Sequence, residues 1–232
     1  MLNFHINFSA DSSSRVLFLG AHSDDIEIGC GGMLNRVARA PADIQIACVV
    51  FSAKGVRAQE TRDALISLMA DSESSTKSKE AAAACKSVNI RCEEFRDGFF
   101  PSAAETIKEY FETLKKEFNP DLIFTHFKQD AHQDHRLINQ LTWNTFRSNA
   151  ILEYEIPKYD GDFNNPTSFL PLTHAQAMRK AQIIYQSFES QQHRQWFDVE
   201  TFMALMRLRG VQCNAPEGYA EGFYSRKQWL SL

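Results

Sequence analysis

The sequence predicts an α/β fold in which helices cover both faces of a mostly parallel sheet. Two observations carry this prediction. Short apolar runs rich in β-branched residues alternate with helix-like segments along the first half of the chain. These runs are almost continuously apolar, which is typical of strands that are covered on both faces. A β-α-β-α order builds a parallel sheet through crossover connections, so the expected architecture is Rossmann-like.

The apolar runs give the expected strands of the first half, which are residues 16–19 (within 15–19), 44–51 and 122–125. Helices are expected at residues 33–40, 60–76, 77–88 and 102–118. In the last of these, Ile107, Phe111 and Leu114 recur at helical spacing, and Asn119-Pro120 is a stop signal.

The second half of the chain is less regular. Residues 152–156 are expected to form a strand and residues 159–166 a turn-rich loop. Helices are expected at residues 173–188, where Thr173 is a suitable N-cap, and at residues 198–209. No repeat, low-complexity tract or linker marks a second domain. Residues 1–232 are therefore expected to form a single domain, with a core at about 15–224.

Composition excludes several classes of protein. The 25 Lys and Arg against 29 Asp and Glu leave a net charge of −4, which argues against a general nucleic-acid binder. The longest apolar run, 46–51, is far shorter than the roughly 18–20 residues that cross a bilayer, and no secretory signal is visible. Five cysteines without CxxC spacing disfavour a disulfide framework or a Cys-based zinc site. We expect a cytoplasmic protein with a small-molecule partner; its oligomeric state, a homo-oligomer included, stays open.

A first polar cluster, residues 20–25 (GAHSDD), directly follows the first expected strand. In open parallel sheets, ligands bind outside the carboxyl ends of the strands. Imidazole and carboxylate groups are good zinc ligands, which points to His22 and one of the adjacent Asp24 and Asp25. Two neighbouring carboxylates repel each other unless a cation or a proton separates their roles. The alternative interpretation is an exposed turn or N-cap cluster, and the glycines that follow do not have the GxGxxG spacing of a nucleotide site.

A second polar cluster follows the strand at 122–125 and holds three of the seven histidines. Its members are His126, Asp130, His132, Asp134 and His135. An isolated histidine at a strand end is usually structural, but three with two aspartates favour a metal site. An aspartate between two histidines can hold an imidazole in one tautomer, which we expect of Asp134.

Together the clusters offer His22, Asp25 and His135 as three metal ligands, with a fourth position for water. This is the pattern of catalytic rather than structural zinc. Such a metal lowers the pKa of its water to roughly 7, and Asp24 can act as the general base. His132 can stabilise the oxyanion and protonate the leaving amine. The sequence therefore indicates metal-assisted hydrolysis.

These motifs resemble a known family. AHSDDIEIGCGG (21–32) and HQDH (132–135) resemble the AHPDDxExGCGG and HxDH signatures of the LmbE/PIG-L-like zinc-dependent deacetylases. Those enzymes remove an N-acetyl group from N-acetylglucosaminyl conjugates or related amino sugars. The resemblance runs from about residue 15 to 224. It implies one zinc ion on His22, Asp25 and His135, Asp24 as base, and His132 as oxyanion stabiliser with Asp134 as its partner.

Weaker matches suggest substrate contacts. Lys77-Ser78-Lys79-Glu80 is similar to an Arg-x-x-Glu motif of the family, Asp97 to an acidic position after the third strand, and 218–223 (GYAEGF) to a C-terminal element that includes Tyr219. Arg209 lies either in the substrate cleft or at a solvated helix end. The sequence departs from the family at Ser23 in place of Pro, at Ile26 in place of a frequent acidic residue, and at Lys77 in place of Arg. A lysine is a point charge that does not reproduce the planar fork of an arginine. The segment 56–76 is also longer than expected.

Three alternatives stay open from the sequence. The same metal centre could hydrolyse another amide or a carbamoyl group, or the fold could bind a sugar conjugate without catalysis. A nucleotide-binding Rossmann protein is disfavoured by the missing GxGxxG.

Overall fold

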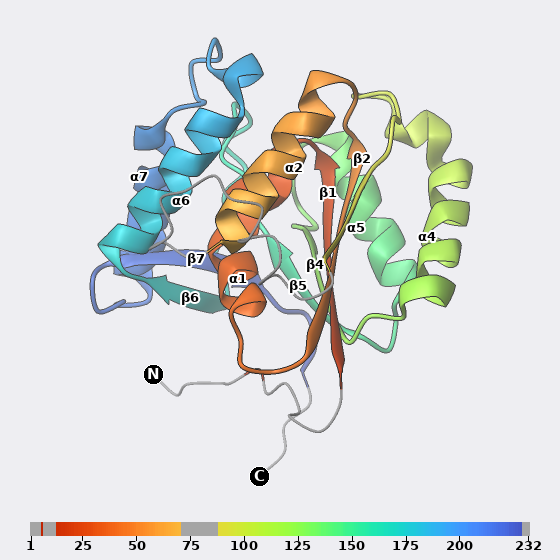
Figure 1. Cartoon of the computed structure of the whole chain (residues 1–232), viewed down its shortest axis with the longest axis horizontal. Coiled ribbons are helices and arrows are strands. Elements are labelled where there is room, and N and C mark those ends of the chain that lie inside the picture. Colours follow the sequence, from red (N-terminus) through yellow and green to blue (C-terminus); the bar gives the residue numbers. More distant parts are fainter. Residues whose placement is uncertain (1–5, 7–12, 71–87, 229–232) are drawn as a thin grey trace.

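A computed structural model describes residue 6 and residues 13–70 and 88–228. Within them the chain forms a seven-stranded sheet of order β3-β2-β1-β4-β5-β7-β6, in which β1 to β5 are parallel and β7 is antiparallel to both of its neighbours (Figure 1). The strands are β1 (Ser14–His22), β2 (Ile44–Ser52), β3 (Val88–Cys92), β4 (Leu122–His126), β5 (Ala150–Tyr154), β6 (Ser168–Leu172) and β7 (Tyr219–Tyr224).

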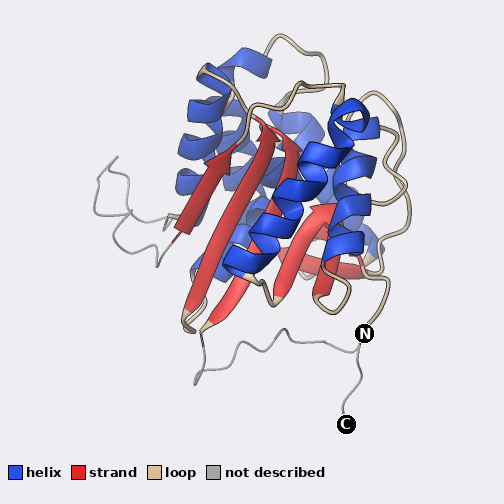
Figure 2. Ribbon diagram, turned by 90° about the vertical axis from the view of Figure 1, so that its right-hand side faces the viewer, coloured by secondary structure: helices blue, strands red, loops and turns tan. Residues whose placement is uncertain are grey.

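Helices cover both faces of the sheet, as Figures 1 and 2 show. The helices are α1 (Asp25–Ala38), α2 (Val56–Met69), α4 (Ala104–Phe118), α5 (Gln133–Thr145), α6 (His174–Ser187) and α7 (Val199–Gln212), with short 3-10 turns at Phe100–Ala103 and Glu189–Gln191. One core cluster joins α1, α2, α6 and α7 to the sheet, and a second joins α4 and α5 to its other face. The predicted fold class is confirmed.

The continuous apolar run of β1 reflects burial on both faces. Val16 and Phe18 pack into the first core cluster, whereas Leu17 and Leu19 pack into the second. All four side chains are inaccessible to solvent. Because successive side chains of a strand point to opposite faces, a strand between two helical layers needs apolar residues at every position. β1 is therefore the central strand on which both layers rest.

The first helix begins eight residues earlier than the sequence suggested, at Asp25 instead of residue 33. The glycines of GCGG (29–32), which directly precede the helix expected at 33–40, lie inside α1, and the helix is kinked at Cys30. Their small size serves close packing. A Cβ on Gly29 would lie 2.0 Å from the Tyr154 ring, and one on Gly32 would lie 2.9 Å from Glu221 Oε1. Close packing, not a helix start, explains these glycines.

Other boundaries differ as well. α2 spans Val56–Met69 rather than 60–76, and β5 spans Ala150–Tyr154 rather than 152–156. The helix expected at 77–88 lies outside the described residues, except that Val88 begins β3. β3, β6 and β7 had no sequence prediction. The expected N-cap at Thr173 is confirmed by a complete capping box with Gln176. In the part of the chain described, none of the helices combines the length and apolar character needed to cross a membrane.

Candidate metal centre

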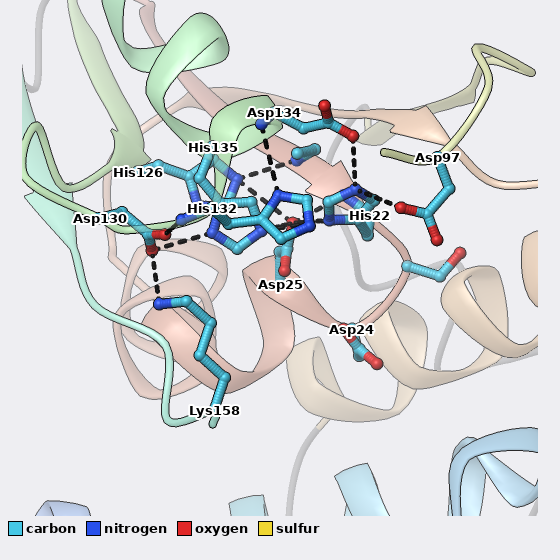
Figure 3. A network of polar contacts seen from close by, with 12 residues as sticks. His22, Asp24, Asp25, Asp97, His126, Asp130, His132, Asp134, His135 and Lys158 are labelled. Carbon is cyan, nitrogen blue, oxygen red and sulfur yellow. Dashed lines mark hydrogen bonds and ion pairs between the residues drawn. The ribbon is translucent and has the colours of Figure 1, made fainter. Parts of the chain in front are cut away.

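Both predicted polar clusters lie where the strand order of the sheet reverses. β2 lies on one side of β1 and β4 on the other, and the paired residues of β1 and β4 cover only 16–18 and 122–124. The carboxyl ends of the two strands therefore separate. Such a switch point is where open parallel sheets bind ligands. His22 ends β1 and His126 ends β4, so the two clusters meet here (Figure 3).

Three side chains bring potential metal-ligating atoms together. His22 Nδ1 lies 3.1 Å from His135 Nε2, and Asp25 Oδ2 lies 3.6 Å from each of these nitrogens. In a tetrahedral zinc site with bonds of about 2.0–2.2 Å, neighbouring ligand atoms are about 3.3–3.6 Å apart. The donor set therefore fits one divalent metal ion. Within the described residues, the potential metal-ligating side chains form three overlapping groupings, and each includes His22 or His135: His22, His132 and His135; Asp25, His126 and His135; and His22, Asp97, His132 and Asp134.

The backbone at the start of α1 directs the adjacent carboxylates to different places. Asp24 adopts a left-handed conformation with φ 91°, and Asp25 begins the helix. A left-handed aspartate costs about 1–3 kcal/mol and is typical of functional sites. Asp25 Oδ2 accepts a hydrogen bond from the His22 backbone N–H at 2.6 Å. Burial alone would raise the pKa of Asp25, but the cluster of imidazoles around it, which carries a proton on His22, holds this pKa well below its usual value. Asp25 is therefore ionised among the histidines.

Asp24 instead faces an arginine. Its Oδ2 atom lies 3.2 Å from Arg57 Nη2, which also donates to the Ser23 carbonyl. Burial raises the pKa of Asp24 to about 7, and the Arg57 guanidinium opposes this rise. A carboxylate with a pKa close to neutral can both accept and return a proton. In Figure 3 the Asp24 side chain lies apart from the imidazole cluster that contains Asp25.

His135 is oriented from behind by Asp130. The two are joined through His135 Nδ1 and Asp130 Oδ2 at 2.9 Å, and both side chains are buried. Burial, with His126 nearby, lowers the pKa of His135 well below its usual value, so its ring is neutral. A proton on Nδ1, shared with Asp130, leaves the Nε2 lone pair facing His22 and Asp25. Carboxylate support of this kind fixes the tautomer of a metal-ligating histidine.

Asp134 supports His22 rather than His132. Its carboxylate accepts from the backbone N–H groups of Gly98 and Phe100 and lies 3.1 Å from His22 Nε2. The sequence predicts that the Asp134 carboxylate holds His132, but His132 receives only the backbone N–H of Asp134, at Nδ1. This N–H still selects a tautomer, because it places the proton of a neutral His132 on Nε2. Burial, with a neighbouring imidazole, lowers the pKa of His132.

His126 fills the space where β1 and β4 separate. Its Nε2 accepts from the Ala21 N–H at 2.9 Å and lies 3.2 Å from Asp25 Oδ2, and its ring stacks on His135 at 3.9 Å. Its Nδ1 is buried without a hydrogen-bond partner. Because its Nε2 accepts the Ala21 N–H, His126 ties the end of β4 to the backbone of β1 beside Asp25 and His135.

Asp97 reaches the cluster from the loop after β3. Its Oδ1 atom lies 3.1 Å from His22 Nε2, on a largely exposed side chain. Burial alone would lower the pKa of His22, but Asp134 and Asp97 outweigh it and raise this pKa to about 10. The metal-free protein therefore keeps a proton on His22 at neutral pH. Asp97 belongs to the grouping of potential ligands that also holds His22, His132 and Asp134. This grouping shares His22 with the three side chains described above, and Asp134 Oδ2 is already engaged by Gly98 and His22.

The other predicted substrate residues are not part of this cluster. Arg209 donates to Glu155 through Nε and Nη2, each at 2.6 Å, and to Gln212 and the Asn164 carbonyl. Tyr219 packs against His174 and Arg207. Lys77 lies outside the described residues. Substrate contacts by these three residues stay predictions.

Four residues near the site were not assigned individual roles from the sequence. They are Arg57, His126, Asp130 and Lys158. His126 and Asp130 carried a signal, since both belong to the polar cluster after β4. Arg57 and Lys158 lie in segments without a motif, and only the folded chain brings them to the site.

Comparison with known proteins places this geometry in context. The family model for GlcNAc-PI de-N-acetylase (PIG-L) matches residues 17–146, which include both polar clusters. An uncharacterized deacetylase of Escherichia coli, YaiS, is 27% identical over 154 residues, which are 64% of this chain and 77% of that protein.

Solved structures share the fold at low sequence identity. N,N'-diacetylchitobiose deacetylase of Pyrococcus horikoshii matches with a TM-score of 0.62 and 17% identity over 90% of this chain and 82% of that one. A 4-carboxy-2-hydroxymuconate hydratase of Pseudomonas putida matches with a TM-score of 0.69 and 17% identity over 94% and 98%. The fold thus accommodates different chemistry, so the site must carry the functional argument.

Proposed function

The chain belongs to the PIG-L family, and on that premise we propose that it is a metal-dependent hydrolase of N-acetylated amino sugars. The reaction would release the N-acetyl group as acetate from an amino sugar or its conjugate. The family description and the deacetylase relative support this reaction class. The hydratase with the same fold does not oppose it, because likeness at 17% identity concerns the fold alone.

One observation carries the proposal: the distances of 3.1 and 3.6 Å among His22 Nδ1, His135 Nε2 and Asp25 Oδ2. Nitrogen and carboxylate donors favour zinc among the divalent metals of hydrolases. When bound, the metal would supply Lewis acidity toward the amide carbonyl and the attacking water. Three protein ligands leave room for these reactants, as catalytic zinc sites do.

Asp24 would act as the general base. Its pKa of about 7 lets it take a proton from water at neutral pH, and Arg57 holds its carboxylate in place. His132 would have the opposite role, that of a proton donor. Because the Asp134 N–H engages Nδ1, the Nε2–H of His132 is the donor available to the oxyanion and to the leaving nitrogen. The exposed Asp97 carboxylate at the same place would contact the substrate.

Acetate release tests this function directly. The purified protein would be stripped of metal, reloaded with one equivalent of zinc, and assayed against N-acetylhexosamines, their conjugates and simple acetamides. We expect acetate release only from the loaded protein and fastest from the sugar conjugates. Turnover that is equally fast on carbamoylated substrates would favour the broader amide or carbamoyl hydrolase. A loaded protein inert on the whole panel, yet binding a sugar conjugate, would favour the non-catalytic module.

A further inference from the structure

One oxygen of the buried Asp130 carboxylate accepts hydrogen bonds from two side chains, an imidazole and an ammonium group. Its Oδ2 atom lies 2.9 Å from His135 Nδ1 and 3.0 Å from Lys158 Nζ. Its other oxygen accepts the backbone N–H of His132 at 2.8 Å. His135 and Lys158 therefore compete for the electron density of the same carboxylate oxygen (Figure 3).

Lys158 is held firmly in this position. It lies in the loop after β5, with a tenth of its side chain exposed, and its ammonium also bonds Asp162 Oδ2 at 2.7 Å. Asp162 in turn accepts the backbone N–H of Ala131 at 2.6 Å. Burial alone would lower the pKa of Lys158, but Asp130 and Asp162 outweigh it and raise this pKa. The group beside Asp130 is thus a fixed ammonium at neutral pH.

A carboxylate behind a metal-ligating imidazole increases the basicity of that ligand, and changes there alter metal affinity about 10–100-fold. An ammonium on the same oxygen withdraws part of this effect. We propose that Lys158 is a positioning residue that limits how strongly Asp130 polarises His135 and thereby sets the affinity of the metal site. This inference rests on the proposed metal-dependent function and concerns a residue outside the recognised motifs.

Two substitutions should change the affinity in opposite directions. Lys158→Met leaves Asp130 to His135 alone and removes a positive charge near the cation, so zinc should bind about tenfold tighter. Asp162→Asn keeps an acceptor for the Ala131 N–H but frees the ammonium to engage Asp130 more strongly, so zinc should bind a few-fold more weakly. Lys158→Arg keeps a positive charge beside Asp130 and should therefore not bind zinc as tightly as Lys158→Met does.

Zinc affinity would be measured on metal-free protein by competition with a chromophoric chelator, and acetate release measured on the loaded forms. Lys128→Met is the matched control, because it removes the same charge from an exposed lysine in the turn after β4. We expect Lys158→Met to bind zinc more tightly yet release acetate more slowly, since a more basic His135 makes the metal a weaker Lewis acid. Structural damage would instead weaken binding and slow the reaction together.

The proposal is overturned if Lys158→Met binds zinc as the parent does or more weakly, or if Asp162→Asn binds it more tightly. Should Lys158→Met fail to fold, Asp162→Asn and Lys158→Gln carry the same test. A parent that binds zinc and releases acetate while these variants leave its affinity unchanged refutes only the role of Lys158. A parent that binds no zinc refutes the proposed function and this inference with it.

Discussion

Two regions of the sheet bury charged side chains, and they differ in how the hydrogen-bonding groups of those side chains are paired. Near β6 and β7, Lys180 Nζ donates to Glu221 at 2.6 Å and to the Ile28 carbonyl at 2.7 Å. Glu221 also accepts the backbone N–H groups of Gly32 and Met33. Each donor there meets an acceptor, so this network is complete within the protein itself.

The switch point between β1 and β4 is different. There the acceptor atoms of His22, Asp25 and His135 face one another, and in the metal-free protein a proton must stand between the two imidazoles. Buried groups whose lone pairs converge lack a partner that a cation can supply. Burial of charge therefore does not by itself indicate a functional site, whereas buried acceptor atoms that converge on one point do.

The largest effect is expected from removing one of the three proposed metal ligands. We expect His135→Ala to lose most of its zinc and its acetate release, because two ligands hold the ion far more weakly than three. Metal content after gel filtration is the measurement. A His135→Ala protein with full zinc occupancy would refute the ligand assignment, and the same experiment on His22→Ala checks it independently.

The adjacent carboxylates of Asp24 and Asp25 should differ in function, one as the general base and the other as a metal ligand. Asp24→Asn should keep its zinc and its fold but lose about 10²–10⁴-fold in rate, the usual effect of losing a general base. Asp25→Asn is the matched variant, since it makes the same exchange one residue along the chain. Unlike Asp24→Asn, it should lose zinc in addition to activity. Single-turnover acetate release and metal analysis on both proteins separate the roles. An Asp24→Asn enzyme within a few-fold of the parent would assign the base elsewhere.

The complete network should respond in stability rather than in metal content. Lys180→Met leaves the Glu221 carboxylate buried without its cation, so we expect a loss of about 3–5 kcal/mol in the free energy of unfolding. Lys108→Met, at the surface pair with Glu112, should cost less than about 1 kcal/mol. Chemical denaturation measures both. Zinc binding by folded Lys180→Met should equal that of the parent; a selective loss of zinc would mean that this region is not merely structural.

The sequence was most informative where structure depends on local pattern. The apolar run of β1 and the polar residues directly after β1 and β4 predicted the parallel sheet and the meeting of His22, Asp25 and His135. β6 and β7 were missed because their pairing is antiparallel and non-local: Phe223 pairs with Tyr154, and Pro171 lies in the edge strand β6. Side-chain contacts between distant loops leave no local signal at all. Hence Lys158 beside Asp130, and the Glu155 partner of Arg209, emerged only from the folded chain.

The smallest expected effect concerns the proton that occupies the site in place of metal. In the metal-free protein the pKa of His22 is raised from 6.5 to about 10, so His22 is protonated at neutral pH. The proton stabilises the metal-free fold fully below about pH 6.5, and this contribution is lost as pH rises through 10. A metal must displace the proton. Zinc binding at pH 7–9 should therefore release about one proton from His22, and the apparent affinity should rise about tenfold per pH unit in this range.

Asp97 offers a variant that tests this coupling. Asp97→Asn removes one of the two carboxylates that hold the His22 proton, so the pKa of His22 should fall and the protein should release fewer protons near pH 9. Asp160→Asn, at an exposed position of the loop after β5, is the control. Calorimetric titration of zinc in buffers of different ionisation enthalpy counts the protons. Because zinc then competes with a weaker proton, Asp97→Asn should also bind zinc more tightly at pH 8, although it loses a negative charge near the cation. Weaker binding at that pH, with proton release unchanged, would show that Asp97 attracts the metal rather than the proton.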